Sequence, residues 1–188
     1  MSSLVDDVGR VLWHGFPGPE VTPDLHAQIA RGEIGAAILF KRNLRTSVVD
    51  GPVPQEVTDV DALCELNRAL HAAAPPHLPL LIAVDQEGGV VQRVRAPATQ
   101  WPPMLALDGH PPGDDEVLAE ELGRALGREL AALGFDIDFA PVLDVHTNPA
   151  NPIIGDRAFG RTAADVTRRA LATARGLAAG GVLACGKH

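Results

Sequence analysis

The sequence predicts an α/β protein in which buried parallel strands alternate with amphipathic helices. Five short apolar runs recur along the 188 residues, with longer segments of helical periodicity between them. Near-continuous apolar runs suit strands that are buried on both faces, as in parallel sheets. Polar residues follow the last three runs directly, at the carboxyl ends where α/β folds bind ligands. Two architectures fit this pattern, an open doubly wound sheet and part of a (β/α)8 barrel.

The individual elements follow from apolar periodicity and from start and stop signals. Strands are expected within residues 8–16, 34–40, 78–84, 137–145 and 181–186. Helices are expected over about 22–32, 59–74, 114–133 and 162–179. Thr22 before Pro23 and Thr162 before Asp165 are N-terminal signals, and Gly134 is a C-terminal one. Leucines at every fourth position between 118 and 130, and Leu133, form the predicted apolar stripe of the third helix. Residues 45–59 are expected to form an exposed loop.

The absence of a phosphate-binding loop favours the barrel over the open sheet. Open sheets that bind nucleotides usually carry a Gly-rich loop after an early strand, whereas "GFPGPE" has prolines where backbone N–H groups would be needed. A complete barrel needs eight units and about 250 residues. Five units are expected here, so residues 1–188 are predicted to form the N-terminal part of one barrel domain, cut after about five βα units.

Composition and charge exclude several classes of function. A formal net charge of -8 and 4% aromatic residues argue against binding to nucleic acid. No apolar stretch approaches the roughly 20 residues that span a bilayer, and the N-terminus does not resemble a signal peptide. A cytoplasmic location without membrane association is therefore expected. Cys64 and Cys185 lie in unlike contexts and are predicted to be buried free thiols.

Polar side chains that follow successive strands are expected to converge on one pocket. The three groups are Asp85, Gln86 and Glu87, then Asp144 and His146, then Lys187 and His188. One such ending is ordinary turn chemistry, but three suggest a common site. The loop over 146–160 is rich in apolar residues and proline, so we expect it to fold over this site and present Arg157.

Three motifs carry a resemblance to a known family. "AVDQEGGVVQR", "DFAPVLDVHTNPANPIIGDRAFG" and the terminal "GKH" resemble signature segments of glycoside hydrolase family 3, in the branch of bacterial β-N-acetylglucosaminidases. The early "GFPG" and "ILFKRN" also match, so the resemblance extends over essentially the whole chain. It implies a (β/α)8 barrel, a retaining mechanism on terminal non-reducing β-linked N-acetylglucosamine, and a role in peptidoglycan recycling.

The resemblance also implies which residues bind the sugar. Its motifs place this role on Asp85, Arg93, Arg157, Lys187 and His188. Charged side chains of these types suit sugar hydroxyls, which both donate and accept hydrogen bonds. Without the resemblance, Arg157 would be read as a salt-bridge partner of Asp156 or Asp144, and the last two residues as a chain end.

The resemblance also implies where the catalytic groups lie and shows where this sequence departs from the family pattern. The family's acid/base histidine and nucleophilic aspartate lie beyond the position of "GKH", so no catalytic residue is expected within residues 1–188. This chain alone is expected to bind substrate without turning it over. Glu87 is expected to support its loop. Val90 stands where relatives usually carry arginine, which bears on local geometry more than on substrate class.

Other functions fit parts of the pattern. Within the same family, a β-glucosidase, a β-xylosidase or a glycoside phosphorylase would share the motifs. A metal-dependent barrel hydrolase could use His14, His146 and His188 with Asp144, although lone histidines at strand ends are more often structural. The preferred reading needs no metal or cofactor and expects a small carbohydrate as partner, with the oligomeric state left open.

Overall fold

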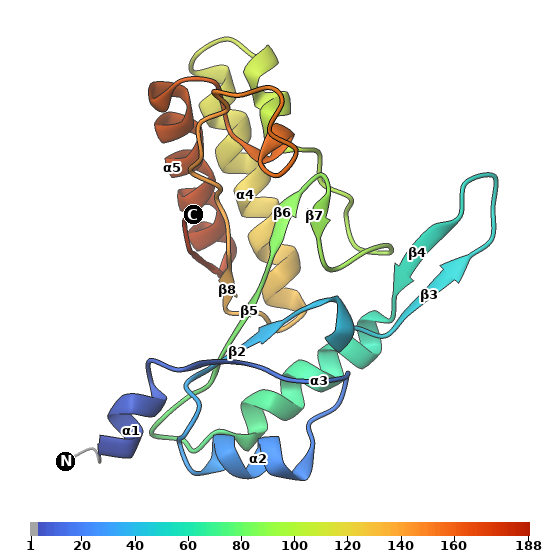
Figure 1. Ribbon diagram of the computed structural model, residues 1–188, viewed down its shortest axis with the longest axis vertical. Coiled ribbons are helices and arrows are strands. Elements are labelled where there is room, and N and C mark those ends of the chain that lie inside the picture. The colour runs from blue at the N-terminus through green and yellow to red at the C-terminus, as the bar shows by residue number, and fades with distance from the viewer. Residues whose placement is uncertain (1–3) are drawn as a thin grey trace. The chain divides into compact units, whose positions relative to one another are not determined.

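In the computed structural model, which describes residues 4–188, the polypeptide divides into two units (Figure 1). Unit 1 consists of the chain up to Val84 together with Arg93–Ala98 and Leu133–Phe135. Unit 2 consists of Asp85–Gln92, Thr99–Ala132 and Asp136–His188.

Unit 1 is built on three parallel strands. They are β1 (Trp13–Gly15), β2 (Ala36–Leu39) and β5 (Leu81–Val84), and β2 lies between the other two. The helices of unit 1 are α1 (Leu4–Gly9), α2 (Pro23–Ala30), the 3-10 helix η1 (Lys41–Asn43) and α3 (Val60–Ala73). As predicted, Thr22 caps α2: its hydroxyl oxygen accepts from the N–H of Leu25 at 3.2 Å.

Unit 1 differs from the sequence prediction in two details. The strand expected within residues 8–16 is present as β1, but it covers only three residues, and α1 extends to Gly9. A short apolar run does not distinguish strand from helix by periodicity alone. The expected loop over 45–59 contains an antiparallel hairpin of β3 (Thr46–Val49) and β4 (Gln55–Thr58). Valine and threonine residues on both sides of a turn that begins at Asp50-Gly51 are typical of a hairpin. The polar and proline-rich composition of the segment nevertheless favoured a loop.

Unit 2 combines two long helices with short strands. The helices are α4 (Asp114–Ala132) and α5 (Ala163–Gly180), with 3-10 helices η2 (Met104–Gly109) and η3 (Gly155–Arg157). The strands are β6 (Gln86–Gly88), β7 (Val91–Gln92), β8 (Ile137–Asp138) and β9 (Leu183–Ala184). The strands β8 and β9 pair in parallel, with α5 between them in the sequence, as a βαβ unit requires. Each of the five apolar runs thus contains a parallel strand, which confirms the predicted alternation.

Glycines allow α4 and α5 to pack with their backbones in close approach. A Cβ atom added to Gly123 would lie 2.3 Å from the carbonyl oxygen of Thr173, and one on Gly176 would lie 2.2 Å from that of Glu120. Figure 1 shows the two helices side by side along their length. The buried face of α4 therefore includes Ala119 and Gly123, while Leu118 of the predicted leucine stripe is 38% exposed.

A buried ion cluster ties α5 to α4 and η2. The guanidinium of Arg169, which is 4% exposed, donates to Asp115 at 2.7 Å, to Asp108 at 2.9 Å and to the carbonyl of Phe159 at 2.8 Å. This burial is unusual, because arginine side chains more often face solvent. Burial by itself raises the pKa of Asp115, but hydrogen bonds from Arg169 and Arg168 outweigh it and hold that pKa at about 2.

The two cysteines match the prediction only in part. Both cysteines are free, as predicted, but Cys185 is exposed and Cys64 is half-buried, so the expected burial was wrong. Among the helices of the described chain, none is long and apolar enough to cross a membrane.

Candidate functional site

The loop after β5 carries the first two polar groups of the site and belongs to unit 2. Its strands β6 and β7 form a short antiparallel turn around Gly88 and Gly89, whose φ angles are +96° and +57°. A Cβ atom on Gly88 would lie 2.4 Å from the carbonyl oxygen of Pro102, so this position needs glycine both for its conformation and for its space. The paired glycines in the sequence therefore shape the turn that holds Asp85 and Glu87.

Two buried polar side chains hold this loop in place. Gln92 accepts from the N–H of Trp101 at 2.9 Å, and its amide donates to the carbonyl of Gly89 at 3.0 Å. Asp138, at the end of β8, accepts from the N–H of Gln86 at 3.0 Å through Oδ1. The sequence patterns did not single out Gln92 or Asp138. The signal available was a polar residue inside an apolar stretch, as in "IDFA".

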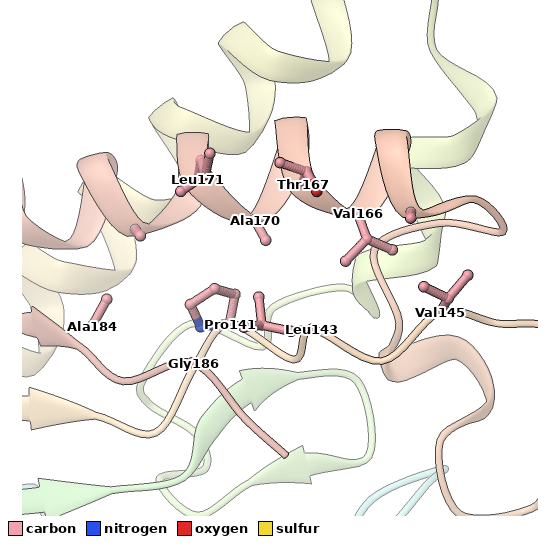
Figure 2. Close-up of a pocket in the computed structure, with 11 residues that line it drawn as sticks. Pro141, Leu143, Val145, Val166, Thr167, Ala170, Leu171, Ala184 and Gly186 are labelled. Carbon is pink, nitrogen blue, oxygen red and sulfur yellow. The ribbon is translucent and has the colours of Figure 1, made fainter.

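The extended segment after β8 separates an apolar face from a polar one. Figure 2 shows Pro141, Leu143 and Val145 pointing toward α5, where they line a groove of about 390 Å³ with Val166, Ala170 and other apolar residues. Asp144 lies between two of these positions in an extended chain, so it faces the opposite side. The groove contains no ionisable side chain, and the polar groups of the candidate site lie away from it.

Lys187 is positioned by backbone bonds to the same segment. Its N–H donates to the carbonyl of Pro141 at 3.1 Å, and its carbonyl accepts from the N–H of Leu143 at 2.6 Å. Its ammonium group lies 2.7 Å from Oδ1 of Asp85 and 2.5 Å from Oε1 of Glu87. The last strand therefore brings its lysine to both carboxylates of the loop after β5, as the convergence argument predicted.

Arg157 reaches one of these two carboxylates, Glu87, from the loop over 146–160. Its Nε and Nη2 donate to the two oxygens of Glu87 at 2.7 and 2.9 Å, and Nη1 donates to the carbonyl of Ile153 at 3.0 Å. This bidentate pair raises the pKa of the Arg157 guanidinium, although burial opposes the effect. The loop therefore places Arg157 beside the loop that follows β5. Its carboxylate partner is Glu87 and neither Asp156 nor Asp144.

His188 completes the cluster next to Arg157. Its Nδ1 lies 2.6 Å from Oδ2 of Asp144, and its Nε2 lies 3.3 Å from Nη2 of Arg157. Because a guanidinium can only donate, Nε2 accepts and Nδ1 carries the proton that bonds to Asp144. Asp144 therefore sets both the orientation and the tautomer of the imidazole.

The six side chains of the cluster differ in their exposure to solvent. The side chain of Glu87 is 2% exposed, whereas those of Asp85, Arg157 and Lys187 are 11 to 17% exposed. The side chains of Asp144 and His188 are 31% and 48% exposed. Glu87 is thus too enclosed to meet a ligand and instead anchors two cations. The partly open groups can offer both donors and acceptors to a polyhydroxylated molecule.

Other candidates from the sequence lie elsewhere or have other partners. Arg93 is half-buried and belongs to unit 1, as does His14, so a sugar-binding role for Arg93 stays a prediction. The backbone N–H of His146 donates to the carbonyl of Gly160. Among the side chains that the structure describes, no three from His, Cys, Asp or Glu are grouped as metal ligands would be. The side chain of Val90 is 70% exposed, and the ion pairs of Glu87 form without the arginine that usually stands there.

Comparison with known proteins identifies the family to which this site belongs. The model of the glycosyl hydrolase family 3 N-terminal domain matches residues 9–188. The chain belongs to glycosyl hydrolase family 3. It is 41% identical over 175 residues to a β-hexosaminidase of Bordetella parapertussis, an alignment that covers 91% of this chain and 45% of the relative. The fold of this N-terminal domain is of the (β/α) barrel type, so the predicted fold class is confirmed; the five parallel strands form only part of a barrel.

Solved structures of family members agree with this assignment. The crystal structure of NagZ from Neisseria gonorrhoeae superposes with a TM-score of 0.80 at 35% identity, covering 94% of this chain and 48% of that one. A β-N-acetylglucosaminidase from Paenibacillus sp. superposes with a TM-score of 0.84 at 34% identity, covering 100% of this chain and 33% of that one. The chain therefore spans half or less of the length of these relatives.

Proposed function

We propose that this chain provides the substrate-binding part of a glycoside hydrolase that removes terminal non-reducing β-linked N-acetylglucosamine by a retaining mechanism. The observation that carries the proposal is the convergence of Asp85, Arg157, Lys187 and His188, all of which belong to unit 2. These are four of the five positions to which the family motifs assign sugar binding. The Neisseria NagZ has been crystallised with N-trifluoroacetyl-D-glucosamine, which supports a sugar of this class.

The geometry of the cluster suits a pyranose with vicinal hydroxyls. Asp85 offers an acceptor beside the Lys187 ammonium, and a hydroxyl placed between them can donate to one and accept from the other. Arg157 and His188 offer a second such pair further toward solvent. Each charge-assisted bond of this kind contributes about 1.5 to 3 kcal/mol. We assign the nucleophile and the acid/base group of a retaining reaction to the part of the relatives' length that this chain does not cover.

A binding experiment on the chain itself tests the first part of the proposal. N-acetylglucosamine titrated into 15N-labelled chain should shift the amide signals of Lys187 and His188, with glucose binding more weakly. Shifts confined to residues of the apolar groove, or equal effects of both sugars, would contradict the assignment to N-acetylglucosamine.

Catalysis is tested by joining the chain at His188 to the remaining half of the Bordetella relative. The joined protein should cleave a chromogenic β-N-acetylglucosaminide with higher kcat/KM than the matching β-glucoside, whereas the chain alone should match a blank preparation. A reversed preference would move the protein to the glucosidase branch. A rate that rises with added inorganic phosphate would indicate phosphorolysis. In keeping with the recycling of peptidoglycan sugars, we propose a cytoplasmic site of action.

A further inference from the structure

One carboxyl group beneath the candidate site is buried without the partners that a charge requires. Asp138 is 0% exposed. Its Oδ1 accepts from the N–H of Gln86, while its Oδ2 is buried and has no hydrogen-bond partner among the residues that the structure describes. Buried carboxylates are normally paired with cations or accept several hydrogen bonds, because removing the charge from water is otherwise very costly.

The neighbouring cations are already engaged. The Lys187 ammonium lies against Asp85 and Glu87, and the Arg157 guanidinium is paired with Glu87 in bidentate fashion. Two carboxylates thus face two cations, and the charges balance without a contribution from Asp138. An ionised Asp138 would add an unpaired negative charge below two existing ones.

We propose that Asp138 carries its proton in the folded protein and is a positioning residue that fixes, through Oδ1, the loop presenting Asp85 and Glu87. The inference rests on the proposed function only for the role of Asp85 in binding sugar. A neutral carboxyl keeps one oxygen as an acceptor for the N–H of Gln86 and does not compete with Asp85 and Glu87 for Lys187. Burial raises the pKa of Asp138, the charges of Asp85 and Glu87 raise it further, and the Gln86 N–H and the Lys187 charge only partly oppose them.

The first experiment observes the proton directly in the unmodified chain. Carbon-13 NMR of the aspartate carboxyl groups, followed from about pH 4 to about pH 8, should show one aspartate that remains protonated after the exposed ones have titrated. The signal is assigned to Asp138 through the backbone. This measurement does not depend on any variant folding. Titration of Asp138 together with the exposed aspartates would overturn the proposal.

The second experiment compares stability across pH in Asp138→Asn. Asparagine keeps the acceptor oxygen and is neutral at every pH. Because the folded pKa of Asp138 lies above its unfolded value near 3.9, the stability of the unmodified chain relative to the variant is highest below that value. This relative stability should fall as the pH rises from about 4, and should level off above the pKa that Asp138 has in the folded chain. Asp114→Asn removes an exposed carboxyl group in the first turn of α4 and is the control; a decrease of the same size in this variant would contradict the assignment to Asp138.

The third measurement distinguishes the hydrogen bond of Asp138 from the space that its side chain fills. Asp138→Leu removes the acceptor for the Gln86 N–H while keeping a side chain of similar size. The Gln86 amide should exchange with solvent at least about tenfold faster in Asp138→Leu than in Asp138→Asn, since its hydrogen bond is lost. Equal exchange in the two variants would contradict a positioning role. Sugar is absent from all three measurements, so their outcome is independent of whether N-acetylglucosamine binds.

Discussion

Replacing Glu87 by glutamine tests whether one enclosed carboxylate organises the cations of the candidate site. Glu87 accepts from Nε and Nη2 of Arg157 and contacts the ammonium of Lys187, and its side chain is 2% exposed. Glutamine has nearly the same shape but carries no charge. One of its two terminal groups is an NH2, which would face a cation as a second donor.

The expected loss of stability follows from what remains for each cation. Breaking a buried ion pair by removing one partner costs about 3 to 5 kcal/mol. Arg157 keeps its bond to the carbonyl of Ile153, and Lys187 keeps Asp85, so the lower end of that range applies. We therefore expect Glu87→Gln to lower the free energy of unfolding by about 3 kcal/mol.

The assay is urea unfolding of the chain, followed by circular dichroism, beside the control Glu56→Gln. Glu56 pairs with Lys41 at 2.8 Å, but the Lys41 side chain is 70% exposed. Exposed pairs contribute at most about 1 kcal/mol, so the control should change little. With a slope of about 1 to 3 kcal/mol per molar urea, Glu87→Gln should shift the midpoint by about 1 M or more at an unchanged slope. A shift no larger than that of the control would refute the reasoning.

Three further predictions concern the site and its support. Asp85→Asn should weaken N-acetylglucosamine binding about tenfold, the equivalent of roughly 1.4 kcal/mol, because an acceptor becomes a donor; unchanged binding in a titration would remove Asp85 from the sugar site. Gly176→Ala should destabilise the chain by about 1 to 3 kcal/mol, since its Cβ would lie 2.2 Å from backbone, whereas Gly109→Ala, with nothing within 4 Å, should be nearly neutral in the same unfolding assay. The carboxyl group of Asp115, whose pKa is lowered from 3.8 to about 2, should contribute about 2 kcal/mol of stability above pH 4 that is lost as the pH falls toward 2. In acid unfolding, the stability difference between the unmodified chain and Asp115→Asn should therefore shrink over this range. A difference that stays constant with pH would contradict the prediction.

The alternation of strands and helices could be read from the sequence because it rests on local patterns. An apolar run, a capping threonine and a terminal glycine act on residues within a few positions of themselves. Thr162 caps α5 and Gly181 ends it with a φ of +100°, close to the predicted bounds. The polar residues after successive strands could also be predicted to meet, since the carboxyl ends of parallel strands lie at one edge of a sheet.

Which of these residues bond to each other was decided by tertiary structure. Glu87 and Arg157 are 70 positions apart, and Asp85 and Lys187 are 102 apart, so no local pattern identifies them as partners. The burial of Arg169 and Asp138 likewise depends on what packs over them, since the same residue types more often face solvent. Periodicity reports which face of an element is apolar. Which charged side chains become partners is decided by tertiary packing, because the distance between two of them depends on every element that lies between them in the sequence.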